Sequence, residues 1–203
     1  MTGCFTNPLR AGRLTPMQTT DTKAVLALVT ICAALSSFAL AGLARGNGGG
    51  VLSVLRSHPT HWSDREADPA SVDASRVEIA SAVESSTPDR EERAALATLA
   101  IKESGLALYV IEGRCGDGPR GACDHGLATG PWQLHASRDV PVVPVAMSEQ
   151  ATIALKRWRT HRKRCAAQGH AGAFTGYGTG FRCEPYAWAR EREAMMRRIA
   201  GKL

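Results

Sequence analysis

The chain has 203 residues, a formal net charge of +6 and a sequence pI of about 9.2. This length accommodates one globular domain of about 130 residues with further segments outside it. The basic charge favours an anionic partner. Because no recognised nucleic-acid-binding module accompanies the basic residues, an anionic cell wall is a better candidate than nucleic acid.

The N-terminal part of the chain divides into three segments. Residues 1–23 are polar and irregular, and residues 24–44 are uncharged and mostly apolar. As a helix, the second segment would extend about 31 Å, enough to cross the hydrocarbon core of a membrane. It is a signal peptide cleaved after Ala39-Leu-Ala41, a retained membrane anchor or a buried helix. The first two alternatives predict an exported protein that is periplasmic, extracellular or anchored facing the cell wall. Residues 45–70 begin with a glycine run and predict a flexible linker.

Residues 71–203 are predicted to form one mainly helical domain without long strands. An amphipathic helix begins the domain, a helix with a basic face runs from Ser148 to about Cys165, and a last helix begins at Pro185. Between the last two helices, residues 169–183 are rich in glycine and predict a loop. The residues expected to face inward in the first two of these helices are Val72, Ile79, Val83, Ala151, Leu155 and Trp158.

A further helix, between Pro88 and Gly105, carries a carboxylate in its last turn. Glu103 lies four residues after Leu99 and seven after Leu96, so it continues the apolar face of this helix. The helix dipole disfavours a carboxylate in the last turn by roughly 0.3 to 1 kcal/mol. Glu103 is therefore either a solvated residue at a helix end or a functional residue whose role offsets this small cost.

An aromatic residue and an amide follow this helix in the sequence. Trp132 and Gln133 come directly after Gly130 and Pro131, and apolar residues flank Glu103 on both sides. A cleft built from these residues would hold a desolvated, proton-donating carboxylic acid. The indole ring would stack on a sugar, and the amide would bond to its substituents.

Three blocks in this region resemble a known family. They are Ile101-Lys-Glu-Ser-Gly105, Gly130-Pro-Trp-Gln-Leu134 and Ala173-Phe-Thr-Gly-Tyr-Gly-Thr-Gly180. In content and order they resemble the lytic transglycosylases of the lysozyme-like superfamily, which includes soluble lytic transglycosylases and goose-type lysozymes. The resemblance implies a two-lobed helical domain that cleaves the glycan strands of peptidoglycan between N-acetylmuramic acid and N-acetylglucosamine.

The resemblance also implies a role for individual residues. Glu103 corresponds to the catalytic acid and base, and Gln133 to the amide that lines the cleft. Tyr177 corresponds to the tyrosine that helps to hold the catalytic carboxyl group. We also expect Trp132 and Ser104 to contact the substrate. No cofactor and no metal is required for this chemistry.

Four cysteines lie in the predicted domain, which allows three disulfide pairings. We favour Cys115 with Cys123 and Cys165 with Cys183, because each pair brackets a glycine-rich loop. The chain contains no Cys-x-x-Cys pair, so a zinc site is disfavoured. Disulfides agree with export from the cytoplasm.

Asp117 and Asp124 are candidates for a second catalytic carboxylate, although a turn residue and a cap are the alternative interpretations. With a second carboxylate roughly 5 to 9.5 Å from Glu103, the enzyme would use water and hydrolyse the bond. With Glu103 alone, the family resemblance implies that a hydroxyl of the sugar itself attacks and gives an anhydro product. We favour the single carboxylate.

The expected partners follow from this interpretation. They are peptidoglycan glycan strands and, if residues 24–44 are retained, a membrane, whereas nucleic acid is not expected. A monomer is expected. The competing hypotheses are a hydrolytic muramidase, such as a phage endolysin, and a non-catalytic cell-wall-binding or virion-associated protein.

Overall fold

The computed structural model describes residues 50–60, 67–114, 128–135 and 146–203. Of these, 72% are helical, in seven helices, which confirms the predicted mainly helical class. The predicted polar segment 1–23 and apolar segment 24–44 lie outside the described residues. The elements are α2 (Val51–Ser57), α3 (Pro69–Ser86), α4 (Arg90–Ser104), α5 (Leu108–Ile111), β1 (Ala128–Thr129), β2 (Leu134–His135), α7 (Met147–Arg164), the 3-10 helix η3 (Ala166–Gln168), α8 (Gly169–Thr179) and α9 (Ala187–Ala200).

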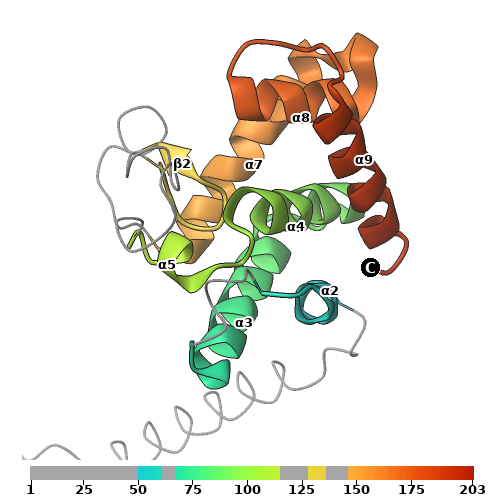
Figure 1. Ribbon diagram of the computed structural model, residues 1–203. Coiled ribbons are helices and arrows are strands. Elements are labelled where there is room, and N and C mark those ends of the chain that lie inside the picture. The colour runs from blue at the N-terminus through green and yellow to red at the C-terminus, as the bar shows by residue number, and fades with distance from the viewer. Residues whose placement is uncertain (1–49, 61–66, 115–127, 136–145) are drawn as a thin grey trace, which may run out of the picture. The chain divides into compact units, whose positions relative to one another are not determined.

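Helix α4 occupies the centre of the described structure, with α2, α3, α7 and α9 packed around it (Figure 1). Its side chains from Ala94 to Ala97, together with Leu99 and Ala100, are fully buried. Small residues on most sides of the helix allow several neighbours to approach it closely. Asp89 caps its N-terminus by accepting a hydrogen bond from the Glu92 amide, and Gly105 ends it in the left-handed conformation. The helix predicted between Pro88 and Gly105 is therefore confirmed.

The predicted linker over residues 45–70 is wrong in its central part. Residues Val51–Ser57 form helix α2, and its three apolar residues, Val51, Val54 and Leu55, are buried in the core. Glu84 of α3 accepts a hydrogen bond from the amide of Val51 at 3.2 Å and so satisfies the start of the helix. A helix this short depends on such tertiary contacts, because its own sequence is too short to be helical alone. Residues before 71 therefore contribute to the hydrophobic core.

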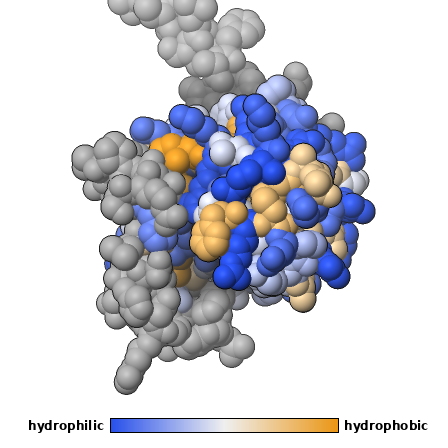
Figure 2. All heavy atoms as spheres, turned by 90° about the horizontal axis from the view of Figure 1, so that it is seen from above, coloured by the Kyte–Doolittle hydropathy of each residue, from blue (hydrophilic) through white to orange (hydrophobic). Residues whose placement is uncertain are grey.

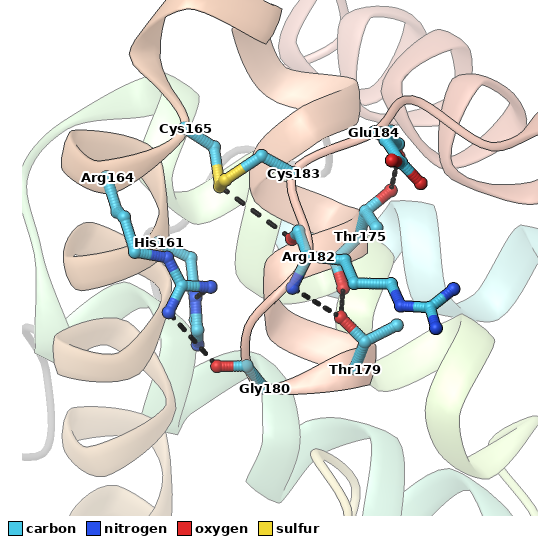
Figure 3. The surroundings of a disulfide bond; sticks show 9 residues. All are labelled: His161, Arg164, Cys165, Thr175, Thr179, Gly180, Arg182, Cys183 and Glu184. Carbon is cyan, nitrogen blue, oxygen red and sulfur yellow. Dashed lines mark hydrogen bonds between the residues drawn. A yellow bond between two sulfur atoms is a disulfide. The ribbon is translucent and has the colours of Figure 1, made fainter.

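Helices α7 and α8 are joined by a short connection that carries a disulfide. The predicted bond between Cys165 and Cys183 is confirmed, with 5.3 Å between the two Cα atoms (Figure 3). Cys165 ends α7, and Cys183 lies in the segment that leads from α8 to α9. The predicted inward residues of α7, Ala151, Leu155 and Trp158, are buried as expected.

The glycine-rich segment predicted as a loop is largely helix α8. Its glycines serve close packing: a Cβ atom on Gly172 would lie 2.9 Å from the carbonyl oxygen of Cys183. A Cβ atom on Gly176 would lie 2.7 Å from Nδ1 of His161 on α7. Glycine is therefore required where α8 meets α7 and the disulfide, although it has low intrinsic helix propensity.

Helix α9 closes the structure against α4 and α8. It buries Ala189, Met196 and Ile199, and its basic residues lie mainly on the outside. Seen from above, the surface is mostly hydrophilic, with hydrophobic side chains in small separate groups (Figure 2). The exposed large hydrophobic residues of the described part include Phe181 and Trp188, which lie in and just after the segment that enters α9.

Candidate active site around Glu103

Glu103 projects from the last turn of α4 and is bound by an arginine from α9. Its side chain is 18% exposed, and its Oε1 atom accepts a hydrogen bond from Nη1 of Arg192. The side chain of Arg192 is 14% exposed, so the ion pair is largely shielded from solvent. Glu103 therefore lies at the partly buried position that the helical pattern predicts, and it faces a positive charge.

Arg192 was not among the residues singled out by the sequence. Its Cζ atom lies 4.6 Å from the ring centroid of Trp188, one turn earlier on α9. The stacked ring and the carboxylate hold the guanidinium from two directions. The partner of Glu103 is 89 residues away, and one arginine among several on a basic helix gives no local signal of such a contact.

Trp132 and Gln133 lie in the turn between β1 and β2. Trp132 is fully buried, and its indole N–H donates to the carbonyl oxygen of Leu96 on α4 at 3.0 Å. The ring is enclosed in the core in this structure, and its predicted stacking on a sugar stays a prediction. Gln133 is half-buried, and its side-chain amide donates to the carbonyl of Gly130 at 3.0 Å. The role of Gln133 toward a substrate stays a prediction.

Tyr177 of α8 connects this turn to the neighbouring helix. Its side chain is buried, and its hydroxyl donates to the carbonyl oxygen of Trp132 at 3.1 Å. The guanidinium of Arg157 lies 4.6 Å from the centroid of the Tyr177 ring. The hydrogen bond from the Tyr177 hydroxyl orients the backbone next to Gln133. The predicted contact of Tyr177 with Glu103 stays a prediction.

Ser104 has a structural role at the end of α4. Its side chain is buried, and its hydroxyl donates to the carbonyl of Ala100 at 2.7 Å and accepts from the amide of Leu106 at 3.1 Å. The hydroxyl thus completes the hydrogen bonding of the helix end, and the predicted contact of Ser104 with substrate stays a prediction.

Two of the three sequence blocks, and the helix that carries the third, meet around Trp132. Its indole N–H donates to α4, the helix that carries Glu103 in its last turn, and its carbonyl oxygen accepts from Tyr177 of α8. The arrangement thus links the carboxylate helix, the Gln133 turn and α8 through two buried hydrogen bonds. Four predicted residues lie outside the described part of the chain: Asp117, Asp124, Cys115 and Cys123.

Chemically, the site offers one carboxyl group that can exchange a proton once Arg192 has moved. Across the described ranges, no group of three or more histidine, cysteine, aspartate or glutamate residues is arranged to hold a metal ion. Within the same ranges, no helix has both the length and the apolar character needed to cross a membrane.

Comparisons with known proteins give no assignment for this chain. No family model, no curated protein sequence and no solved structure matches it. The resemblance to lytic transglycosylases therefore depends on the three sequence blocks and on the residues that they contain.

Proposed function

We propose that this protein is an exported or membrane-tethered lytic transglycosylase that cleaves peptidoglycan glycan strands between N-acetylmuramic acid and N-acetylglucosamine. The proposal includes a two-lobed, lysozyme-like fold for the domain. Glu103 is the catalytic residue, and Gln133 helps to position the sugars. No cofactor or metal takes part.

One observation carries this assignment. The three blocks that resemble the family are far apart in sequence, yet Trp132 joins the helix of Glu103 to the helix of Tyr177 through bonds of 3.0 and 3.1 Å. The packing of these two helices around one buried residue of the second block is what the resemblance requires, and it supports the proposal. The partial burial of Glu103 at a helix end that disfavours its charge points in the same direction.

In the proposed mechanism, Glu103 acts first as an acid and then as a base. Its carboxyl group donates a proton to the glycosidic oxygen while the bond to N-acetylmuramic acid breaks. The resulting carboxylate then accepts the proton of the sugar hydroxyl that attacks the same carbon. The product is an anhydro sugar, and no water is consumed. Because Arg192 occupies Oε1 of Glu103, this contact must open before the proton can be transferred.

Digestion of purified peptidoglycan by the oxidised full chain tests this function. We expect anhydro fragments, identified by mass spectrometry, and a loss of roughly 10²- to 10⁴-fold in their rate of release for Glu103→Gln. Glu191→Gln is the matched control, because it removes an exposed carboxylate beside Arg192 in the sequence and should leave the rate unchanged. Undiminished lysis by Glu103→Gln would refute the assignment.

The same digestion separates the two alternatives. Fragments with a reducing end, heavier by one water, would identify a hydrolytic muramidase and direct attention to Asp117 and Asp124. A cell-wall-binding protein without catalysis is favoured by one observation, the ion pair that occupies Glu103. For that protein, wall binding would persist while no fragment is released by the folded wild-type chain.

A further inference from the structure

The contact between Glu103 and Arg192 leaves hydrogen-bonding capacity unused on both side chains. Within residues 50–60, 67–114, 128–135 and 146–203, neither side chain has another hydrogen-bond partner. An arginine has several N–H donors in a planar fork, and a carboxylate has two oxygen atoms. Neither side chain contributes a fully buried unpaired polar atom, so the remaining donors and the second oxygen are open to solvent. A further charged group can therefore bind here.

On the surface beside this pair, two aromatic rings lie between two guanidinium groups. The ring of Trp188 lies against the guanidinium of Arg192. It is also nearly parallel to the ring of Tyr186, with 6.3 Å between the two centroids and 18° between the ring planes. The hydroxyl of Tyr186 accepts a hydrogen bond from Arg182 at 2.7 Å. We call these four residues, Arg182, Tyr186, Trp188 and Arg192, the 182–192 row. Aromatic rings contact sugars, and guanidinium forks bind carboxylates.

We propose that Arg192 is a substrate-recognition residue. It holds Glu103 in the ligand-free protein and releases it when a carboxylate on the peptide stem of a glycan strand takes over the guanidinium. This inference rests on the proposed function, because peptidoglycan strands supply both the sugars and the stem carboxylates.

The geometry explains why a second carboxylate can displace the first. Arg192 bonds only one oxygen of Glu103, whereas a carboxylate from outside can approach the unused side of the fork and bind through two oxygens. The basic residues of α9 and the net charge of +6 attract such an anion. A neutral sugar chain carries no carboxylate that could replace Glu103 on Arg192, so it leaves the ion pair closed. Binding of the stem and release of Glu103 are then thermodynamically coupled.

Binding of small fragments tests the recognition step without catalysis. The probes are disaccharide-peptide fragments, which contain no bond between N-acetylmuramic acid and a following N-acetylglucosamine, and the same fragments with amidated stem carboxylates. We expect calorimetry on the full chain to give at least about 10-fold tighter binding of the unmodified fragment. Arg192→Gln should bind both fragments about equally. Arg190→Gln, which removes an exposed charge from the same helix, should keep the preference.

Cleavage of intact and amidated glycan strands tests the release step. Wild type should cleave amidated strands more slowly than intact ones, whereas Arg192→Gln should cleave amidated strands faster than wild type does, because Glu103 is no longer held. A merely structural role of Arg192 would slow both substrates. Thermal unfolding of each variant shows that it is folded.

The possible results separate this inference from the proposed function. Equal binding of both fragments by wild type overturns the inference, and anhydro fragments from wild type would still support the transglycosylase. A carboxylate preference that only Arg192→Gln abolishes supports recognition by Arg192. If no glycan cleavage accompanies that preference, the enzymatic function fails and the recognition site remains.

Discussion

The two ends of α4 each carry a glutamate bound by an arginine, and the two pairs differ in how completely they are satisfied. Glu92 accepts hydrogen bonds from Nε and Nη2 of Arg159, each at 2.7 Å, and from the hydroxyl of Thr87 at 2.6 Å. Glu103 receives one hydrogen bond from Arg192. Glu92 also lies near the N-terminus of the helix, where the dipole favours its charge, and Glu103 lies at the opposite end.

This difference separates a structural carboxylate from a candidate catalytic one. The Glu92 side chain is 11% exposed, and its three hydrogen bonds connect α4 to α7 and to the end of α3. Both of its carboxylate oxygen atoms are engaged in these bonds. Glu103 is similarly shielded, but it is held by a single exchangeable contact in an unfavourable helix position. Residual bonding capacity, more than burial or charge, distinguishes the two sites.

Removing the disulfide should have the largest effect on stability, because it joins the helix of Arg159 to the segment that leads to the helix of Arg192. The double variant Cys165→Ala/Cys183→Ala should lower the free energy of unfolding by about 3 kcal/mol through the greater entropy of the unfolded chain. Chemical denaturation checks this value.

Hydrogen exchange on the same double variant sharpens the comparison. Amides of α9 should exchange faster relative to those of α4, because the segment that leads to α9 loses its disulfide to the end of α7 while the bonds around Glu92 remain. Equal acceleration in both helices would mean that the two arginine pairs belong to one cooperative unit.

Replacing each glutamate by glutamine should give unequal losses of stability. Glu92→Gln should lower the free energy of unfolding by about 1.5 to 3 kcal/mol, because hydrogen bonds to a charged, shielded group are lost. Glu103→Gln loses a single hydrogen bond from Arg192 and gains relief of roughly 0.3 to 1 kcal/mol from the helix dipole, so its net loss should be smaller than that of Glu92→Gln. Urea denaturation of both variants measures the difference, and comparable losses would contradict it.

The sequence predicted those parts of the structure whose signals are local. The ends of α4 could be placed because Asp89 and Gly105 act on their own helix. The disulfide between Cys165 and Cys183 brackets a short segment, so its pairing could be favoured from spacing. Local patterns also placed Glu103 on the apolar face of its helix.

The features that the sequence did not reveal depend on distant partners. The indole N–H of the buried Trp132 donates to the carbonyl oxygen of Leu96, 36 residues earlier. No turn pattern in the sequence indicates this contact. Helix α2 is stabilised by its contacts with the core and by Glu84, which accepts a hydrogen bond from the amide of Val51, 33 residues earlier. Arg192 reaches Glu103 across 89 residues. These contacts exist only after the helices pack, so residue type and spacing could not predict them.

The smallest expected effect is the pH dependence that Glu92 contributes to stability. The hydrogen bonds from the Arg159 guanidinium hold the pKa of Glu92 below its ordinary value, although burial opposes this shift. Because the folded-state pKa is lower than the unfolded-state pKa of about 4.3, the contribution to stability is complete above that value. It is lost as the pH falls through the folded-state pKa.

We therefore expect the difference in stability between wild type and Glu92→Gln to be constant from about pH 6 to pH 7 and to shrink below about pH 4. Denaturation curves at several pH values measure it, with Glu91→Gln as the control because Glu91 is more exposed and lies beside Glu92. A difference that persists unchanged into acid would show that the loss in Glu92→Gln comes from packing. In that case the satisfied ion pair would not be what distinguishes Glu92 from Glu103.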